Sequence, residues 1–203
     1  MRLGEYDTRD DEEVPKHEDF KARRIIIHKN FSYIPGHGSD IALIELDTPV
    51  SFKSHIVPIC LPESGVNFQG QEALVSGWGK TSDSWFEQYE GKLRSTRVKV
   101  VSNSECAAYG KARNSTFVVS KTHLCAGSKS STTCLGDSGG PLSVTRIGRA
   151  VLIGLVSAGV DCEMPDVPSF FTDVSIHMQW IRENTDRDEA ELTPTEFAGF
   201  YMA

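Results

Sequence analysis

Long apolar stretches are missing from this sequence of 203 residues. No stretch approaches the roughly 18 to 20 unbroken apolar residues that a membrane-spanning helix requires, so no membrane partner is expected. The opening residues, MRLGEYDT, are polar and charged, and they contain neither the apolar core nor the cleavage site of a secretory signal peptide. The sequence therefore predicts a globular protein and, as written, carries no export signal.

Basic clusters are also missing. The formal net charge is -7, and half of the 28 acidic residues lie in two segments, 5–19 and 183–196, which leaves the rest of the chain nearly neutral. Binding to nucleic acid gains most of its free energy from the release of counterions by grouped Lys and Arg side chains. The composition therefore argues against a nucleic-acid partner.

Cysteine pairs spaced for metal binding are absent as well. The five cysteines are Cys60, Cys106, Cys125, Cys134 and Cys162. None falls in a C-x-x-C pair and no histidine has the spacing of a zinc ligand, so no metal centre is predicted from them. Two glycosylation sequons, at Asn30 and Asn114, agree with a secreted protein that contains disulfides, and the odd cysteine then needs a partner elsewhere. The simplest reconciliation with the missing signal is that residue 1 is not the natural start.

What the sequence does contain is a series of short apolar or alternating runs bounded by Gly, Pro, Ser or Asp. Runs of this length and composition predict β-strands, and together they indicate an all-β protein. The predicted strands are 23–28, 40–46, 72–78, 93–101, 141–146, 150–159 and 169–174.

The segments between and after these runs predict turns, one helix and a tail. Residues 146–149 predict a hairpin turn with Gly148 at positive φ, and the unpatterned stretch 62–71 is the best candidate for a linker between two halves. A helix is predicted to start near Ser175, whose hydroxyl can cap it. Residues 186–203 are predicted to be an acidic tail with three aromatic residues that could dock weakly.

The string CLGDSGGPL, residues 134–142, places Ser138 between glycines. A hydroxyl needs a base to remove its proton and an oxyanion site to hold the developing charge. Gly136, Gly139 and Gly140 allow the backbone to bend tightly and to bring amide N–H groups close to a substrate carbonyl. Alone, D-S-G-G favours a glycine-rich turn capped by its Asp, but chance matches to the whole string are very rare.

This string resembles the nucleophile loop of the chymotrypsin-like serine proteases. Further segments match in the family's order: DIALIEL, PICLP, SGWG, GLVSAG and HMQWIREN, with RLGEYD resembling a surface loop. The resemblance extends from residue 2 to about 184, and the sequences of these segments are most similar to those of the arthropod clip-domain proteases. It implies two antiparallel six-stranded β-barrels of the trypsin-like fold, the first incomplete, and a C-terminal helix. The implied parts are 1–64 (first-barrel remnant), 65–174 (second barrel), 175–185 (helix) and 186–203 (tail).

The resemblance also implies roles for individual residues. Ser138 corresponds to the nucleophile, Gly136 and Ser138 to the oxyanion donors, and Asp40 to the buried residue that orients the base. Without the family resemblance, Asp40 would be interpreted as a residue at the start of a strand whose carboxylate accepts hydrogen bonds from the amides of a turn. Asp137 corresponds to the acid that pairs with the ammonium group formed by zymogen cleavage.

The residues implied for substrate binding are Thr132, Ser157, Gly159 and Ser169. Ser157 is expected to bond near Asp40, and Gly159 to bind substrate main chain. Thr132 corresponds to the pocket floor, and because it is neutral we expect a preference for apolar or aromatic side chains. Two rim carboxylates, Asp161 and Asp166, could reach a basic side chain.

One element of the family is missing. The base is a histidine in an A-A-H-C string, and this string is nowhere in the sequence. Six histidines are present, and each has a plain surface or loop explanation. His17 alone lies upstream of Asp40 in a suitable loop, but its charged neighbours indicate a solvated side chain. Because loss of one triad member costs on the order of 10⁴ to 10⁶ in turnover, the isolated chain is expected to be inactive.

The resemblance further implies the disulfides Cys106–Cys125 and Cys134–Cys162. It leaves Cys60 unpaired, in the place where clip-type members tie the catalytic domain to a prodomain.

The acidic loop from Glu5 to Glu18 coincides with the family's calcium loop, although a solvated charge run explains it equally well. No other cofactor is expected. The implied partners are a protein substrate and an inhibitor such as a serpin, and the implied location of the full-length protein is extracellular.

Two functions remain open from the sequence. The first is a fragment of a secreted serine endopeptidase, which the intact GDSGGP favours. The second is a non-catalytic protease homologue that acts as a binding or regulatory module of a proteolytic cascade.

Overall fold

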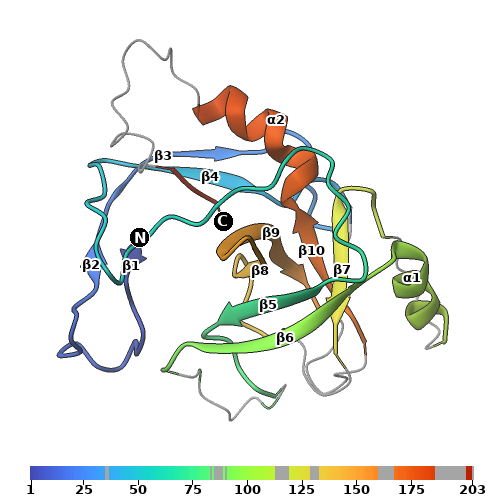
Figure 1. Cartoon of the computed structure of the whole chain (residues 1–203), viewed down its shortest axis with the longest axis horizontal. Helices are drawn as coiled ribbons and strands as arrows, with labels where there is room; N and C mark the ends of the chain where they lie inside the picture. Colours follow the sequence, from blue (N-terminus) through green and yellow to red (C-terminus); the bar gives the residue numbers. More distant parts are fainter. Residues whose placement is uncertain are drawn as a thin grey trace.

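The structure of the chain is a computed structural model in which a closed barrel lies beside a smaller open sheet (Figure 1). No helix in the described part is long and apolar enough to cross a membrane. The described residues are 1–34, 37–82, 84, 89, 91–112, 119–128, 133–159, 167–185 and 200–202.

Six antiparallel strands form the barrel, in the order β10-β7-β6-β5-β8-β9. They are β5 (Glu72–Gly77), β6 (Arg94–Val101), β7 (His123–Gly127), β8 (Pro141–Arg146), β9 (Arg149–Ala158) and β10 (Ser169–Asp173). In β6, buried Val98 and Val100 alternate with exposed Arg97 and Lys99, as expected where one face of a strand packs inward. The barrel centre is filled by fully buried side chains: Phe68, Leu142, Ile153 and Phe171. The six-stranded barrel predicted for the C-terminal half is confirmed.

The N-terminal part forms smaller sheets. β1 (Arg2–Leu3) pairs with β2 (Glu18–Asp19), and β3 (Ala22–Ile27) pairs with β4 (Ala42–Leu46). The other edge of β4 pairs with β11 (Phe200–Met202). The predicted tail thus has a short strand at residues 200–202, where two of the aromatic residues that were expected to dock, Phe200 and Tyr201, pair with β4, while residues 186–199 lie outside the described part.

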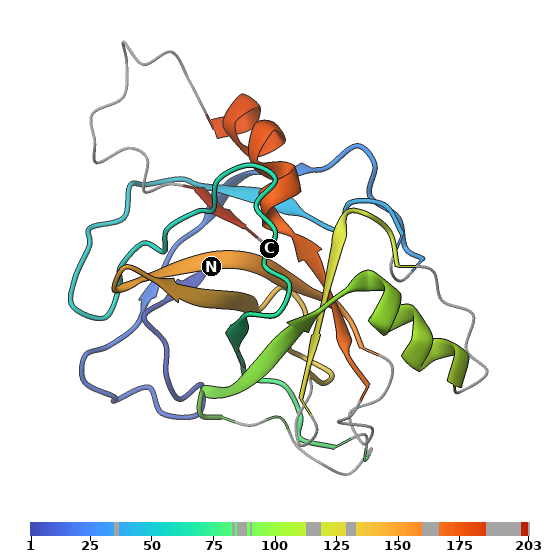
Figure 2. The same ribbon diagram turned by 45° about the vertical axis from the view of Figure 1, so that its right-hand side comes forward.

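A second cluster of buried side chains joins the open sheet to the barrel. Ile41 and Leu43 pack with Leu152 and Leu155 of β9 and with the apolar face of helix α2 (Val174–Thr185). Figure 2 shows α2 lying over this junction, whereas α1 (Asn103–Ala112) projects from the side of the barrel. Because the catalytic residues predicted from the sequence come from both parts, this packing fixes their relative positions. The predicted part boundaries themselves stay a prediction.

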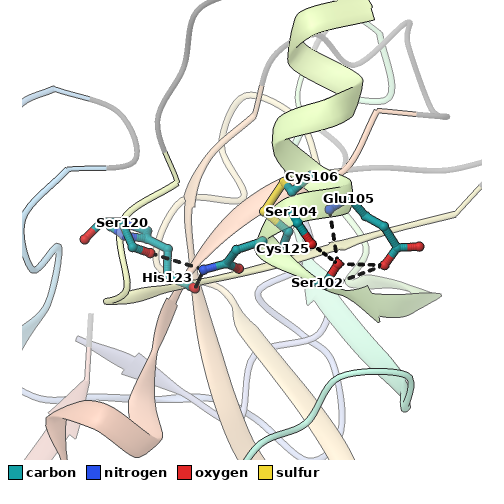
Figure 3. The surroundings of a disulfide bond; sticks show 8 residues. Ser102, Ser104, Glu105, Cys106, Ser120, His123 and Cys125 are labelled. Carbon is teal, nitrogen blue, oxygen red and sulfur yellow. Dashed lines mark hydrogen bonds between the residues drawn. A yellow bond between two sulfur atoms is a disulfide. The ribbon is translucent and has the colours of Figure 1, made fainter.

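Three secondary-structure predictions need correction. Helix α1 was missed although Ser102 and Glu105 form a reciprocal capping box: Ser102 Oγ accepts from Glu105 N–H at 3.1 Å, and Glu105 Oε2 accepts from Ser102 N–H at 3.1 Å (Figure 3). Strand β7 was missed as well. Helix α2 starts one residue earlier than predicted, because Asp173 Oδ1 accepts from Ser175 N–H at 2.9 Å and acts as the cap in place of Ser175.

The hairpin turn between β8 and β9 contains a strained residue. Gly148 has φ 70° as predicted, but Ile147 also has a positive φ, 49°, and its side chain is fully exposed. A β-branched residue is poorly suited to this conformation, which Asn adopts more readily. We expect Ile147→Asn to raise the free energy of unfolding by about 1 kcal/mol in urea titrations, whereas Ile147→Val keeps the strain. An Asn variant less stable than the parent would contradict this explanation.

Candidate active site

Ser138 lies in the loop that precedes β8, and glycines shape this loop. Gly136 and Gly139 have φ angles of 97° and 79°, which other residues rarely adopt. The N–H of Gly140 donates to the carbonyl of Asp137 at 2.8 Å and closes a tight turn around Ser138. The side chain of Ser138 is exposed at the tip of this turn.

The backbone N–H groups of Gly136 and Ser138 are the predicted oxyanion donors. Within the described part of the chain, neither N–H donates to another group. Both are therefore available to an oxygen atom of a ligand.

Asp137 turns its carboxylate away from Ser138 and into the protein. Its Oδ1 accepts from Gly79 N–H and its Oδ2 from Cys134 N–H, both at 2.9 Å. A Cβ atom at Gly77 would lie 2.0 Å from Asp137 Oδ1, so the glycines of the SGWG segment leave room for this carboxylate. The predicted pairing with a zymogen-derived ammonium group stays a prediction, and the amino group of Met1 donates to the carbonyl of Phe20.

Asp40 lies just before β4 and is held by two hydroxyl groups of the barrel. Its Oδ2 accepts a hydrogen bond from Ser157 Oγ at 2.6 Å, and its backbone carbonyl accepts from Thr172 Oγ1 at 2.7 Å. The hydroxyl of Thr122 donates to the nearby carbonyl of Gly38. These contacts bind the Asp40 segment to β9 and β10.

Strand β9 connects the Ser138 loop with Asp40. Gly139 N–H donates to the carbonyl of Val156 at 2.8 Å, and Val156 N–H donates to the carbonyl of Gly140 at 2.9 Å. The next residue, Ser157, donates to Asp40. Strand β9 is therefore hydrogen-bonded both to the predicted nucleophile loop and to the predicted orienting carboxylate.

None of the six histidines, all of which lie in the described part, forms a hydrogen bond with Asp40 or Ser138. The charge of Asp40 acts on His123, but His123 is only 2% exposed and its Nδ1 contacts Thr122 Oγ1 at 3.2 Å. Burial lowers the pKa of His123, and the charge of Asp40 opposes this shift only partly. No histidine of the chain is therefore hydrogen-bonded as the base of a triad would be.

The prediction that every histidine is a surface or loop residue was wrong for His123 and His177. His123 is buried in β7, and His177 is buried on α2, where its Nδ1 donates to the carbonyl of Asp173 at 2.7 Å. His28 packs its ring 5.4 Å from that of His177, and burial followed by the charges of His177 and Lys29 lowers the pKa of His28. His17, predicted to be solvated, has a side chain only 7% exposed.

The residues predicted to line a substrate pocket lie together as far as the structure describes them. Gly159 lies against Thr133 and Ser169, since a Cβ atom at Gly159 would be 3.7 Å from either side-chain oxygen. Thr133 Oγ1 donates to Ser169 Oγ at 2.8 Å, and both residues are buried. Thr133 was missed by the sequence analysis, although it directly follows Thr132. The predicted floor residue Thr132 and the rim residues Asp161 and Asp166 lie outside the described residues.

Comparison with known proteins identifies the family to which this geometry belongs. The sequence profile described as Trypsin matches residues 1–181. The chain belongs to the trypsin family of serine proteases. Members of this family are endopeptidases that act on protein substrates.

Named relatives within the trypsin family are similar over most of the chain. Serine protease filzig of Drosophila melanogaster is 34% identical over 90% of the chain, and trypsin-1 of Astacus astacus is 35% identical over 79%. Vitamin K-dependent protein C of Mus musculus is 36% identical over 89% of the chain. The chain spans 11%, 65% and 40% of the lengths of these three proteins.

The cysteines follow the trypsin-family pattern where the structure describes them. Cys106 of α1 and Cys125 of β7 form a disulfide (Figure 3). Cys134 is also disulfide-bonded, and its predicted partner Cys162 lies outside the described residues. Cys60 is free and half-buried. Of the two sequons, Asn30 is exposed and Asn114 lies outside the described part.

The loop that corresponds to the family's calcium loop does not have a calcium-type ligand set. Its two inward-facing carboxylates, Glu5 and Glu13, share their space with the imidazole of His17, and Glu5 Oε2 accepts from Arg2 at 3.0 Å. Calcium in proteins prefers six to eight oxygen ligands, whereas this cluster offers two carboxylates and an imidazole nitrogen. The residues present therefore do not fit calcium. The alternative of a solvated charge run describes the exposed Asp10, Asp11 and Glu12 but not the buried side chain of Glu5.

Proposed function

We propose that this chain carries the nucleophile side of a serine endopeptidase active site that forms an acyl-enzyme on Ser138. The proposal rests on the hydrogen bond from Ser157 to Asp40. Ser157 lies in β9, which is also hydrogen-bonded to the Ser138 loop, so the bond places Asp40 relative to Ser138. Asp40 is proposed to orient a histidine that the six histidines of the chain do not supply. The isolated chain is therefore proposed to be inactive or nearly so.

Each proposed role follows from the chemistry of the groups. In a complete site, the imidazole would remove the proton of Ser138 Oγ as the oxygen attacks a peptide carbonyl, and would later donate that proton to the leaving amine. Asp40 would accept from the other ring nitrogen and favour the imidazolium form. The free N–H groups of Gly136 and Ser138 would donate to the oxyanion, and Asp137 would hold their loop through Gly79 and Cys134.

Substrate preference is proposed from the pocket wall. In the described wall, the hydroxyl of Thr133 donates to that of Ser169, so these residues offer hydroxyl groups but no charge. With a neutral Thr132 at the predicted floor, the pocket has no counter-ion for Arg or Lys. We therefore propose a preference for apolar or aromatic side chains.

The setting of the full-length protein is also a proposal. The free Cys60, the exposed sequon at Asn30 and the disulfides agree with an extracellular protein whose prodomain binds through Cys60. The relatives named serine protease filzig and serine proteinase stubble are much longer than this chain. We propose that the full-length protein acts in an extracellular proteolytic cascade of the clip-domain type, with a serpin as its inhibitor.

Labelling with a fluorophosphonate tests the proposed nucleophile. We expect one slow adduct on Ser138 by mass spectrometry, faster labelling when free imidazole is added, and no adduct in Ser138→Ala. Ser143→Ala, which removes a serine from β8 outside the loop, is the matched control and should label like the parent. An adduct that persists in Ser138→Ala would contradict the assignment of the nucleophile.

The absence of a base also supports a second function, a binding or regulatory module without catalysis. Complete lack of labelling at Ser138, even at high imidazole concentration, would favour this module over the endopeptidase.

A further inference from the structure

Two carboxylates and one imidazole meet at the base of the loop between β1 and β2. Glu5, Glu13 and His17 each offer one ligand atom, and these three atoms all lie within 4.8 Å of one another. The cluster is shielded from solvent, since the side chains of Glu5 and His17 are 4% and 7% exposed.

The imidazole nitrogen that faces this cluster has no hydrogen-bond partner. His17 Nδ1 lies 3.2 Å from Glu5 Oε2, but not in hydrogen-bonding geometry, and it is buried and unpartnered in the described structure. A buried nitrogen beside a carboxylate is costly unless a proton or a metal ion lies between them.

The carboxylates are held in place by the backbone of the same loop. Glu13 accepts from the N–H groups of Tyr6 and Asp7 at 3.1 and 3.0 Å, and Glu5 Oε1 accepts from Tyr6 N–H at 3.1 Å. Beside His17 in the chain, the carbonyl of Lys16 contacts His55 Nε2 at 3.1 Å. The ligand atoms are therefore positioned before any ion binds.

The carboxylate of Glu13 has no ion pair in the described structure. The nearby guanidinium of Arg2 pairs with Glu5 and Asp19 instead.

Two neighbouring acids already have ion pairs. Asp7 lies 3.5 Å from Arg9, and Glu18 pairs with Lys53.

We infer that Glu5, Glu13 and His17 form a binding site for a divalent transition metal of the zinc class, in place of the calcium that the family implies. Zinc is commonly bound by imidazole nitrogen together with carboxylate oxygen in four-coordinate sites, and water can supply a fourth ligand. The ion would link the two ends of the loop, next to β1 and β2. It has no part in the proposed chemistry at Ser138.

Isothermal titration of the chelator-treated chain tests this site. The background is Cys60→Ser, so that the free thiol does not bind the ion. We expect one zinc ion per chain, bound at least tenfold more tightly than calcium, and a loss of at least tenfold in zinc affinity in His17→Gln. His37→Gln, which changes an exposed histidine outside the cluster, should bind zinc like the parent.

A second variant guards against misfolding. Glu13→Gln keeps an acceptor for the Tyr6 and Asp7 amides while removing a charge, so it should fold and still lose zinc affinity. The inference is overturned if calcium binds more tightly than zinc, if zinc does not bind, or if zinc affinity is unchanged in both His17→Gln and Glu13→Gln. Because the readout is binding, failure of the proposed endopeptidase function would leave this result unaffected.

Discussion

Peptide hydrolysis by the purified chain is expected to be about 10⁴- to 10⁶-fold slower than hydrolysis by a complete trypsin-family protease. The physical reason is the missing base: no histidine in the described structure bonds to Asp40 or Ser138, so the hydroxyl of Ser138 keeps its proton at neutral pH. The measurement is turnover of a peptide library followed by mass spectrometry.

Two variants control the turnover measurement. Ser138→Ala should have the same residual turnover as the parent within experimental error, because a nucleophile without its base contributes little. Rapid hydrolysis that is lost in both Ser138→Ala and Asp40→Asn would show that the chain has a working base, and it would contradict the expected inactivity.

Phe171→Ala is expected to lower the free energy of unfolding by about 3 to 5 kcal/mol. Phe171 is fully buried at the centre of the barrel core, and it lies in β10, the strand that also carries Ser169 and Thr172. The substitution leaves a cavity, and a loss of this size is a large part of the roughly 5 to 15 kcal/mol that stabilises a typical domain. Urea denaturation followed by tryptophan fluorescence measures the effect.

Phe52→Ala is the matched control for this core substitution. Phe52 is 48% exposed, so the same change of residue should alter stability by about 0.5 kcal/mol or less. Equal effects at positions 52 and 171 would contradict the assignment of Phe171 to the barrel centre.

Strands with regular patterns could be predicted from the sequence, whereas irregular elements could not. β9 was predicted from its long apolar run, which the fold buries on both faces. β6 was predicted from valines that alternate with charged residues. β7 reads HLCAG, which has no alternation of polar and apolar residues, and its pairing with β6 and β10 becomes visible only in three dimensions. The capping box of α1 was the signal that the sequence analysis overlooked.

The site residues were proposed from the family resemblance, and only the structure could bring them together. Asp40 and Ser157 are 117 positions apart in the chain, so no local pattern predicts their hydrogen bond. Thr133 was missed for the same reason, because its partner Ser169 is 36 residues away. His17 was misjudged because charged neighbours in sequence indicate solvent, whereas the fold of its loop turns the imidazole toward Glu5 and Glu13.

A crystal structure of the chain would show how Ser138 and Asp40 lie relative to each other. We expect Ser138 Oγ and the Asp40 carboxylate on the two sides of one open site, with Ser157 bonded to Asp40 and no histidine of this chain between them. Electron density that places the two groups on separate surfaces, or that shows one of the six histidines bridging them, would contradict it.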